Sequence, residues 1–259
     1  MHDTGTFQPG PAFRAWYLPD DDHPLGYLPL NAASLLLAEG QMVLQGEPCR
    51  LVLPVRRDLT EALDAVRLCL RRHGLITAVR GEAMAVCREP HLPQIAEIDR
   101  SALRLLGLWA VKVHVNGVVR APAGGRLVWL SHRAEHATAE PGHWDTLVAG
   151  GQPAGSSIRD TAIREGWEEA GLDPQLLAGL TPMGDLPVLY ASPHGLHREL
   201  LAIFELVLPA SFHPVCQDGE VQGFRLLDGA ALDNALRGGL PLKFSSRLAI
   251  EQMLATPRG

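Results

Sequence analysis

Cysteine is scarce in this sequence and shows no arrangement typical of a zinc finger or a disulfide scaffold. The four cysteines, Cys49, Cys69, Cys87 and Cys216, include no C-x-x-C pair and no histidine spacing typical of zinc. In a chain of 259 residues this usage indicates reduced thiols and a cytoplasmic protein.

Other absences narrow the class of protein further. The N-terminus lacks a basic segment followed by an apolar one, so we expect no secretory signal. No uncharged apolar run approaches the roughly 20 residues of a membrane span. The net charge is −6, with 23 Lys and Arg against 29 Asp and Glu. We therefore expect no nucleic-acid polymer and no membrane as a partner.

The first half of the chain shows helix signals without catalytic chemistry. Asp58 is placed as an N-cap, Glu61 completes a capping-box pattern, and Gly74 follows the last apolar position at helical spacing. A second helix is predicted over Pro93–Leu106. We interpret residues 1–105 as an N-terminal α+β extension and residues 106–259 as the catalytic domain.

The second half shows strand patterns. Apolar residues alternate with Lys112, His114 and Asn116, which predicts a half-buried strand. Residues 126–131 are its expected hairpin partner, and residues 187–191 with 199–208 form a second expected hairpin. Residues 144–155 are interpreted as a glycine-punctuated loop that leads into a helix, and residues 229–255 as helical.

Three glutamates carry the chemical signal. At about 100° per residue, Glu165, Glu168 and Glu169 fall within one arc of a helix, opposite Ile163 and Trp167. Like charges on one helix face repel each other, and a divalent cation reverses that cost. Carboxylate oxygens suit Mg²⁺ or Mn²⁺, which also bridge to phosphates. Taken alone, such a cluster is more often a solvated acidic face.

The surrounding residues resemble the Nudix box, G-x(5)-E-x(7)-R-E-U-x-E-E-x-G-U, in which U is a bulky apolar residue. The box specifies nine positions, and the seven that match are Gly150, Arg164, Glu165, Glu168, Glu169, Gly171 and Leu172. Ser156 replaces the first glutamate and Gly166 the first U. Gly151 permits an alternative alignment in which Ser157 is the nearest substitute.

The resemblance implies a Nudix α/β/α sandwich with a mixed sheet, a smaller α+β domain ahead of it, and attack of water on a diphosphate. Glu165, Glu168 and Glu169 would bind Mg²⁺ or Mn²⁺, and Arg164 would orient a glutamate through an ion pair. Ser156 leaves the number of metals open. Family members often use a glutamate far downstream as a metal ligand or base, and Glu220 is our candidate.

Segments outside the box are similar to one branch, the thiamine pyrophosphokinase-associated Nudix proteins with an N-terminal extension. They are residues 112–117, 143–155 and 218–224, and in the extension residues 80–82, 97–100 and 107. This similarity implies hydrolysis of thiamine diphosphate or its oxidised analogues to a monophosphate and phosphate. A nucleoside diphosphate-X such as ADP-ribose or NADH is the alternative substrate, and a Nudix-fold ligand sensor is the alternative function.

Several further residues are candidates for substrate binding, although each has an ordinary structural explanation. Trp144 could stack on a thiazolium or pyrimidine ring or belong to the core. The complete set of candidates is Gly150, Gly151, His114, Asn116, Arg133, Trp144 and Arg198. The sequence leaves open whether the chain forms a homodimer and which glutamate is the base.

Overall fold

The computed structural model describes residues 10–77, 79, 81–121, 124–137, 140–193 and 195–256. The chain divides into two compact units. Unit 1 comprises the residues up to Ala110 with Pro153–Gly155 and Pro187–Glu199, and unit 2 comprises Val111–Gln152, Ser156–Leu186 and the residues from Leu200 onward. Residue 80, named above in the N-terminal extension, lies outside the described residues, and the domain boundary at residue 105 stays a prediction.

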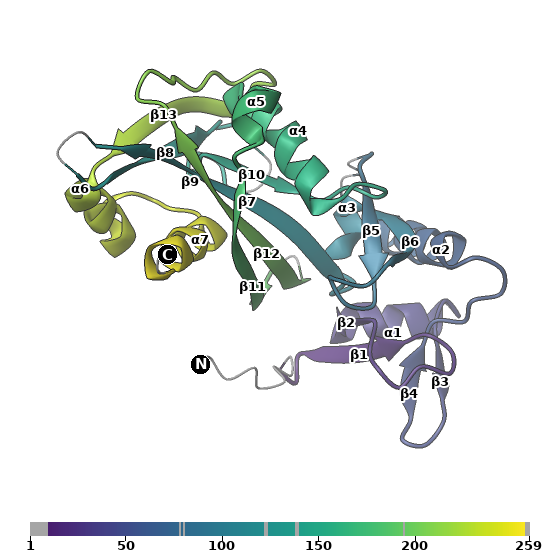
Figure 1. The fold of residues 1–259 in the computed structure, drawn as a ribbon. Helices are drawn as coiled ribbons and strands as arrows, with labels where there is room; N and C mark the ends of the chain where they lie inside the picture. The colour runs from purple at the N-terminus through teal and green to yellow at the C-terminus, as the bar shows by residue number, and fades with distance from the viewer. Residues whose placement is uncertain are drawn as a thin grey trace. The chain divides into compact units, whose positions relative to one another are not determined.

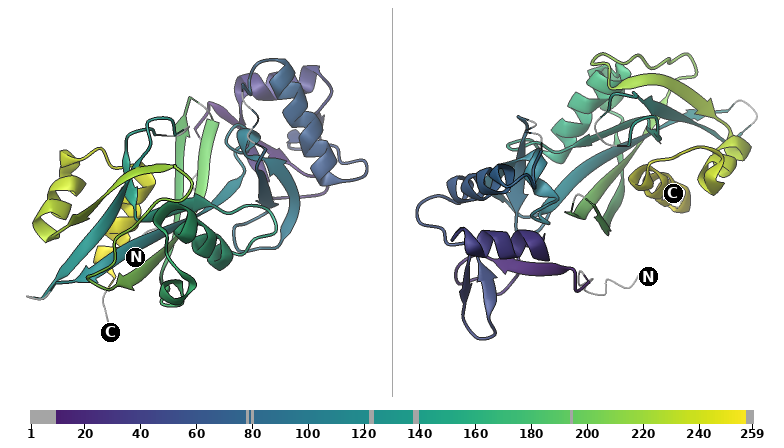
Figure 2. Two further views of the ribbon diagram at one scale, coloured as in Figure 1. Left: turned by 90° about the horizontal axis from the view of Figure 1, so that it is seen from above. Right: turned by 180° about the vertical axis from the view of Figure 1, so that it is seen from behind.

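Strands and helices are interspersed along the chain, mostly as runs of two to four strands followed by one or more helices (Figures 1 and 2). In order, they are β1 (Phe13–Tyr17), β2 (Gly26–Pro29), α1 (Leu30–Ala38), β3 (Val43–Gln45), β4 (Arg50–Val52), α2 (Leu59–Arg72), β5 (Ala83–Cys87), β6 (Gln94–Asp99), α3 (Arg100–Leu103), β7 (Trp109–Arg120), β8 (Arg126–Arg133), β9 (Trp144–Thr146), β10 (Val148–Gly151), α4 (Ile158–Ala170), α5 (Pro174–Leu177), β11 (Thr181–Ser192), β12 (Gly195–Leu208), β13 (Val221–Leu227), α6 (Gly229–Asn234), the π-helical segment η1 (Ala235–Gly239) and α7 (Phe244–Ala255).

Unit 1 contains a four-stranded sheet in the order β2-β1-β4-β3 and a separate β5-β6 hairpin. The helix predicted after Asp58 is confirmed as α2, because the Asp58 carboxylate accepts a hydrogen bond from the Glu61 N–H at 3.0 Å. Gly74 follows the helix with a φ of 74°, as a C′ glycine does. Helices α1 and α2 share one apolar core through Leu36, Cys69 and Leu70, among others.

The helix predicted over Pro93–Leu106 is wrong. Gln94–Asp99 forms strand β6, antiparallel to β5, and only Arg100–Leu103 is helical. Ala96 and Ile98 are buried in β6 and alternate with exposed residues, which is the two-residue period of a strand. The Asp99 carboxylate then caps the short helix α3. Pairing with β5 decided the conformation, and the sequence spacing alone did not show it.

Unit 2 confirms the sandwich arrangement. Its sheet has the order β11-β12-β7-β8-β13, with β10 paired to β7 and β9 to β8. Along β7, Val113 and Val115 share a core with α4 and α5, whereas Val118 shares another core with α6 and α7. Since successive side chains of a strand point to opposite faces, α4 and α7 cover opposite faces of the sheet (Figure 1).

Two details of unit 2 differ from the sequence predictions. Strand β7 is buried on both faces from Val113 to Val119, because α7 covers the face that was expected to be open. The segment predicted as a glycine-punctuated loop contains β9 and β10, and Gly150 pairs with Val113 and Gly151 with Lys112. Only the stretch after Gly151 connects to the helix.

The remaining expectations for the second half are confirmed. Strands β7 and β8 pair antiparallel, with Gly117 opposite Trp129, and β11 lies beside β12. The C-terminal region is helical in α6 and α7, with η1 between them. Among the described residues, no helix is both long enough and apolar enough for a membrane crossing.

Two glycines of unit 1 differ in how closely another backbone segment approaches them. Gly107 (φ 60°) and Gly40 (φ 65°) are both left-handed, but a Cβ on Gly107 would lie 2.8 Å from the Tyr27 nitrogen, and one on Gly40 would meet nothing within 4 Å. Gly40→Ala should cost about 1 kcal/mol of unfolding free energy, and Gly107→Ala about 2 kcal/mol more. Urea unfolding measures both, and equal losses would contradict the close approach.

Candidate functional site

Helix α4 carries the predicted glutamates, and both of its ends are fixed locally. The Ser157 hydroxyl accepts a hydrogen bond from the Asp160 N–H at 3.0 Å, and Gly171 ends the helix in a left-handed conformation with a φ of 64°. Ala162 and Ala170 pack into the core of unit 2, whereas Trp167 is 53% exposed. The helix therefore faces the sheet through small side chains, which bring its backbone close to β10.

Two of the glutamates lie against the backbone of β10, Glu169 buried and Glu165 largely covered. Glu169 is 3% exposed, and its Oε2 accepts a hydrogen bond of 2.8 Å from the Ala149 N–H. Glu165 lies over Gly150, where an added Cβ would overlap the glutamate carboxylate. A side chain at position 150 would therefore displace the Glu165 carboxylate from this place.

Arg164 forms ion pairs with two of the three glutamates, Glu165 and Glu168. Its Nη2 donates to Glu165 Oε1 and its Nη1 to Glu168 Oε2, both at 2.6 Å. The Glu168 side chain is 35% exposed and that of Glu165 only 13%. Arg164 thus lies between the outer and the inner carboxylate, and its role as an orienting residue stays a prediction.

Glu220 reaches the same region from a distant part of the sequence. The segment before it follows the end of α4, because the Gln217 N–H donates to the Glu168 carbonyl at 2.7 Å and the Val215 N–H donates to the Ala170 carbonyl at 3.1 Å. The exposed Glu220 carboxylate lies near enough to Glu165 to contribute to raising its pKa. The structure therefore brings Glu220 to the glutamates of α4.

Burial and crowding make these carboxylates reluctant to ionise. Burial, with the charges of Glu168 and Glu220, raises the pKa of Glu165 to about 7, although Arg164 opposes the shift. Burial, with Glu165 and Asp145, raises the pKa of Glu169 well above its usual value, against the Ala149 N–H and Lys243. A bound cation would reverse both shifts.

The donor set fits a hard divalent cation in composition. Glu165, Glu168, Glu169 and Glu220 offer only oxygen ligands, which Mg²⁺ and Mn²⁺ prefer. Their oxygens do not converge on one point here: among the described residues, the one group of three His, Cys, Asp or Glu side chains with ligand atoms within 4.8 Å of one another is elsewhere, in unit 1. For a cation to bind, Arg164 would have to release the carboxylate oxygens of Glu165 and Glu168 that it now binds. Alternatively, these glutamates would have to bind the cation through their second carboxylate oxygens.

A buried charge network behind Glu169 was missed by the sequence analysis. Asp145 is 1% exposed, and its Oδ2 accepts a hydrogen bond of 2.9 Å from Lys243 Nζ, while the Ser246 hydroxyl donates to its Oδ1. Burial pushes the pKa of Asp145 upward, but Lys243, with His114, Ser246 and Arg133, holds it well below the usual range. No signal in the sequence indicated it, because residues 144–155 were interpreted as a loop, where an aspartate is ordinary.

The predicted substrate-binding residues are dispersed. His114 and Asn116 are fully buried on the α7 face of the sheet, where His114 Nδ1 lies 3.0 Å from Thr146 Oγ1 and Asn116 Nδ2 lies 3.4 Å from the Phe204 and Ala249 carbonyls. Arg133 Nη1 lies 3.6 Å from Asp145 Oδ2. These contacts make all three parts of the interior of unit 2, and their role toward substrate stays a prediction.

The aromatic and arginine candidates are also engaged in internal contacts. Trp144 is buried, with its ring stacked on His132 at 4.4 Å between centroids and under the Arg225 guanidinium at 4.8 Å. Arg198 belongs to unit 1, where its Nη1 donates to the Leu25 carbonyl at 3.0 Å and its guanidinium lies 4.4 Å from the Trp109 ring. Their roles toward substrate remain predictions.

The departure of Gly166 from the box has a packing explanation. A Cβ on Gly166 would lie 2.9 Å from Leu177 Cδ2 and 3.4 Å from Leu172 Cδ1. Leu177, on α5, therefore occupies the space beside α4 that a larger residue at position 166 would need. Ser156 lies one residue before the helix cap, and no packing contact of this kind explains its replacement of a carboxylate.

Comparison with known proteins identifies the family. A family model described as NUDIX domain matches residues 111–242, about half of the chain. The chain belongs to the Nudix domain family. Its residues 111–242 include Gly150, the glutamates of α4 and Glu220.

Two plant proteins are similar over most of this chain. It is 32% identical over 197 residues to Nudix hydrolase 24, chloroplastic, of Arabidopsis thaliana, covering 76% of this chain and 54% of that protein. It is 30% identical over 204 residues to Nudix hydrolase 20, chloroplastic, of the same plant, covering 79% and 54%. The chain spans about half the length of these curated relatives.

One solved structure gives a weaker likeness. The protein DR0079 from Deinococcus radiodurans aligns with a TM-score of 0.46 and 18% identity, covering 68% of this chain and 98% of that one. At these values the likeness adds nothing to what the family model already says of this chain.

The close approach of Glu165 to β10 predicts the effect of enlarging Gly150. Gly150→Ala should displace the Glu165 carboxylate and weaken Mn²⁺ binding by roughly tenfold or more. Gly223→Ala, on β13, is the control, because its Cβ would meet only His132 Cβ at 4.0 Å. Electron paramagnetic resonance of free Mn²⁺ measures both, and unchanged binding in Gly150→Ala would contradict the prediction.

The raised pKa of Glu165 predicts a pH dependence of the metal-free protein. Its pKa is about 7 in the folded chain and 4.5 without the fold, so the folded state binds more protons between these values. The unfolding free energy should therefore fall as pH rises from about 4.5 to 7, by at most about 3 kcal/mol from this residue. Glu165→Gln should make the unfolding free energy decrease less over this pH range.

Urea unfolding with a chelator at several pH values measures the slope. Glu251→Gln, which removes an exposed carboxylate of α7, is the matched control and should keep the wild-type slope. An identical slope in wild type and Glu165→Gln would show that Glu165 titrates normally.

Proposed function

We propose that this chain catalyses metal-dependent hydrolysis of a diphosphate linkage in an organic diphosphate. The observation that carries the proposal is the acidic face of α4, with Glu169 buried and Glu165 largely covered against β10 inside a Nudix domain. The relatives named Nudix hydrolases support the same activity. Burying like charges is unfavourable without a cation, so the arrangement favours binding one.

Four carboxylates would hold the ion. Nudix hydrolases generally use divalent metal ions, and we propose Mg²⁺ or Mn²⁺ bound by Glu165, Glu168 and Glu169 with Glu220. When bound, the ion would polarise the phosphoryl oxygens and lower the pKa of water. Arg164 would keep Glu165 and Glu168 oriented without contacting substrate.

Glu165 or Glu220 would accept the proton from the attacking water. The water oxygen forms a bond to phosphorus, the bridging P–O bond breaks, and a monophosphate and phosphate leave. Both carboxylates belong to the proposed metal-binding set, so each would lie within reach of a water molecule bound to the ion. Glu220 is exposed, so it would reach a water molecule without rearranging the interior.

The substrate proposed is thiamine diphosphate or one of its oxidised analogues. The support is the similarity of residues 112–117, 143–155 and 218–224 to the thiamine pyrophosphokinase-associated branch. A nucleoside diphosphate-X such as ADP-ribose or NADH is the alternative, because the box specifies the diphosphate and not the group attached to it. A cytoplasmic location and a homodimer stay predictions from the sequence.

Substitution of the glutamates tests the activity. Glu168→Gln and Glu169→Gln should each lower Mg²⁺- or Mn²⁺-dependent phosphate release by roughly a hundredfold or more, because each removes a charged ligand and keeps its shape. Glu251→Gln should leave release unchanged. Circular dichroism checks that the variants are folded, and retained activity in both site variants would overturn the assignment.

A panel of substrates distinguishes the proposed substrate from the alternatives and the hydrolase from a sensor. It contains thiamine diphosphate, its oxo and oxy analogues, ADP-ribose, NADH and nucleoside triphosphates. Turnover of the thiamine compounds that Glu169→Gln abolishes supports enzyme and substrate together. Turnover of a nucleotide alone keeps the hydrolase and overturns the thiamine proposal. No turnover, with a ligand that still raises the melting temperature, overturns the hydrolase in favour of a sensor.

A further inference from the structure

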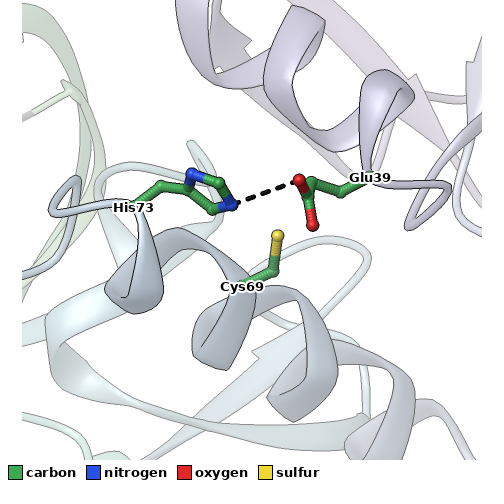
Figure 3. A group of neighbouring side chains, drawn as sticks. All are labelled: Glu39, Cys69 and His73. Atoms are coloured by element: carbon green, nitrogen blue, oxygen red, sulfur yellow. Dashed lines mark ion pairs between the residues drawn. The ribbon is translucent and has the colours of Figure 1, made fainter.

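Three side chains of different chemistry meet at the ends of two helices in unit 1. Cys69 lies in the last turns of α2, His73 caps that helix, and Glu39 caps α1. Their ligand atoms, one sulfur, one nitrogen and one oxygen, all lie within 4.8 Å of one another. Figure 3 shows the Cys69 sulfur directed toward the ion pair between His73 Nε2 and Glu39 Oε1, which are 3.3 Å apart.

The backbone fixes this arrangement. Cys69 and His73 are four residues apart on α2, a spacing that places two side chains on one helix face, and the His73 N–H donates to the Cys69 carbonyl at 3.2 Å. Glu39 is held at the end of α1, where its N–H donates to the Leu35 carbonyl at 2.9 Å. Since α1 and α2 share one core, the third ligand approaches the other two without moving a helix.

The donors match a borderline metal such as zinc. Zn²⁺ binds cysteine sulfur at about 2.3 Å and histidine nitrogen or carboxylate oxygen at about 2.0–2.2 Å. Tetrahedral ligands are then roughly 3.3–3.8 Å apart, so small side-chain rotations would close the present group. The His73 and Glu39 side chains are 36% and 34% exposed, which leaves room for water as a fourth ligand.

A helix-to-helix ion pair beside a buried cysteine is the simpler explanation. Arg72 Nη1 lies 3.9 Å from Glu39 Oε2 and would compete with a cation for this carboxylate. Cys69 is 1% exposed, and its burial raises the pKa of the thiol, so without a metal the sulfur stays protonated. The sulfur nevertheless points at the ion pair, where a packing role does not require it to be.

We propose that Glu39, Cys69 and His73 form a zinc site that joins α1 to α2. On binding, the Cys69 S–H bond breaks, the sulfur bonds to Zn²⁺ and the proton passes to solvent. The spacing Cys-x₃-His within one helix is not a zinc-finger pattern, and the third ligand lies 30 residues earlier in the sequence. No local spacing in the sequence therefore indicates this site.

Cobalt substitution tests the proposal with a readout that the carboxylates of α4 cannot give. Co²⁺ added to the metal-free full chain should produce a saturable thiolate-to-cobalt charge-transfer band, and Zn²⁺ should abolish it. Cys69→Ser should remove the band. Cys49→Ser and Cys216→Ser, the latter close to Glu220 in the sequence, should retain it.

Variants of the two solvent-exposed ligands, His73 and Glu39, test the proposal even if Cys69→Ser does not fold. His73→Gln and Glu39→Gln replace half-exposed side chains and should each weaken Co²⁺ binding at least tenfold, while His23→Gln and Glu47→Gln should not. Absence of the band in the wild-type chain would overturn the proposal. A band that survives in Cys69→Ser, or that neither His73→Gln nor Glu39→Gln weakens, would also overturn it.

Discussion

The candidate site depends on two carboxylates that are withdrawn from water against the backbone of β10, Glu169 fully and Glu165 for the most part. Removing a charged carboxylate from water costs several kcal/mol unless nearby groups replace the lost solvation. The Ala149 N–H does so in part for Glu169, and Arg164 does so in part for Glu165. The compensation is incomplete, because the pKa of both groups stays raised. A cation at this face would therefore stabilise the folded chain as well as take part in chemistry.

The opposite face of the sheet keeps this arrangement in register. Lys243 binds Asp145 through its side chain and donates its N–H to the Trp144 carbonyl at 2.9 Å, so that α7 is attached to β9 at its first residue. The chain contains only two lysines, and one of them serves this buried contact. Strand β10 follows β9 by a single residue, so fixing β9 also fixes the backbone over which Glu165 and Glu169 lie. The network behind the sheet thus positions the acidic face in front of it.

The sequence predicted correctly those features that depend on residues close together in the chain. Asp58 and Glu61 predicted where α2 begins, and the spacing of the glutamates predicted one acidic helix face, because both patterns depend only on helical geometry. The helix predicted over Pro93–Leu106 failed where pairing with β5 outweighed the local pattern. The prediction that β7 is only half-buried failed because α7, more than 120 residues later in the chain, covers His114 and Asn116. The Glu39–Cys69–His73 cluster joins residues of two helices, so no local pattern contains it.

The two departures from the Nudix box have different physical meanings. The bulky residue expected at position 166 contributes volume, and Leu177 of α5 lies beside the helix in the space such a residue would need. A change of this kind is neutral for the chemistry as long as the core stays filled. The glutamate expected at position 156 contributes charge, which the Ser156 hydroxyl does not replace. Glu220 is held near Glu165 by the chain that follows the end of α4. It is an exposed carboxylate from outside the helix, and in the proposed metal site it would supply the charge that position 156 lacks.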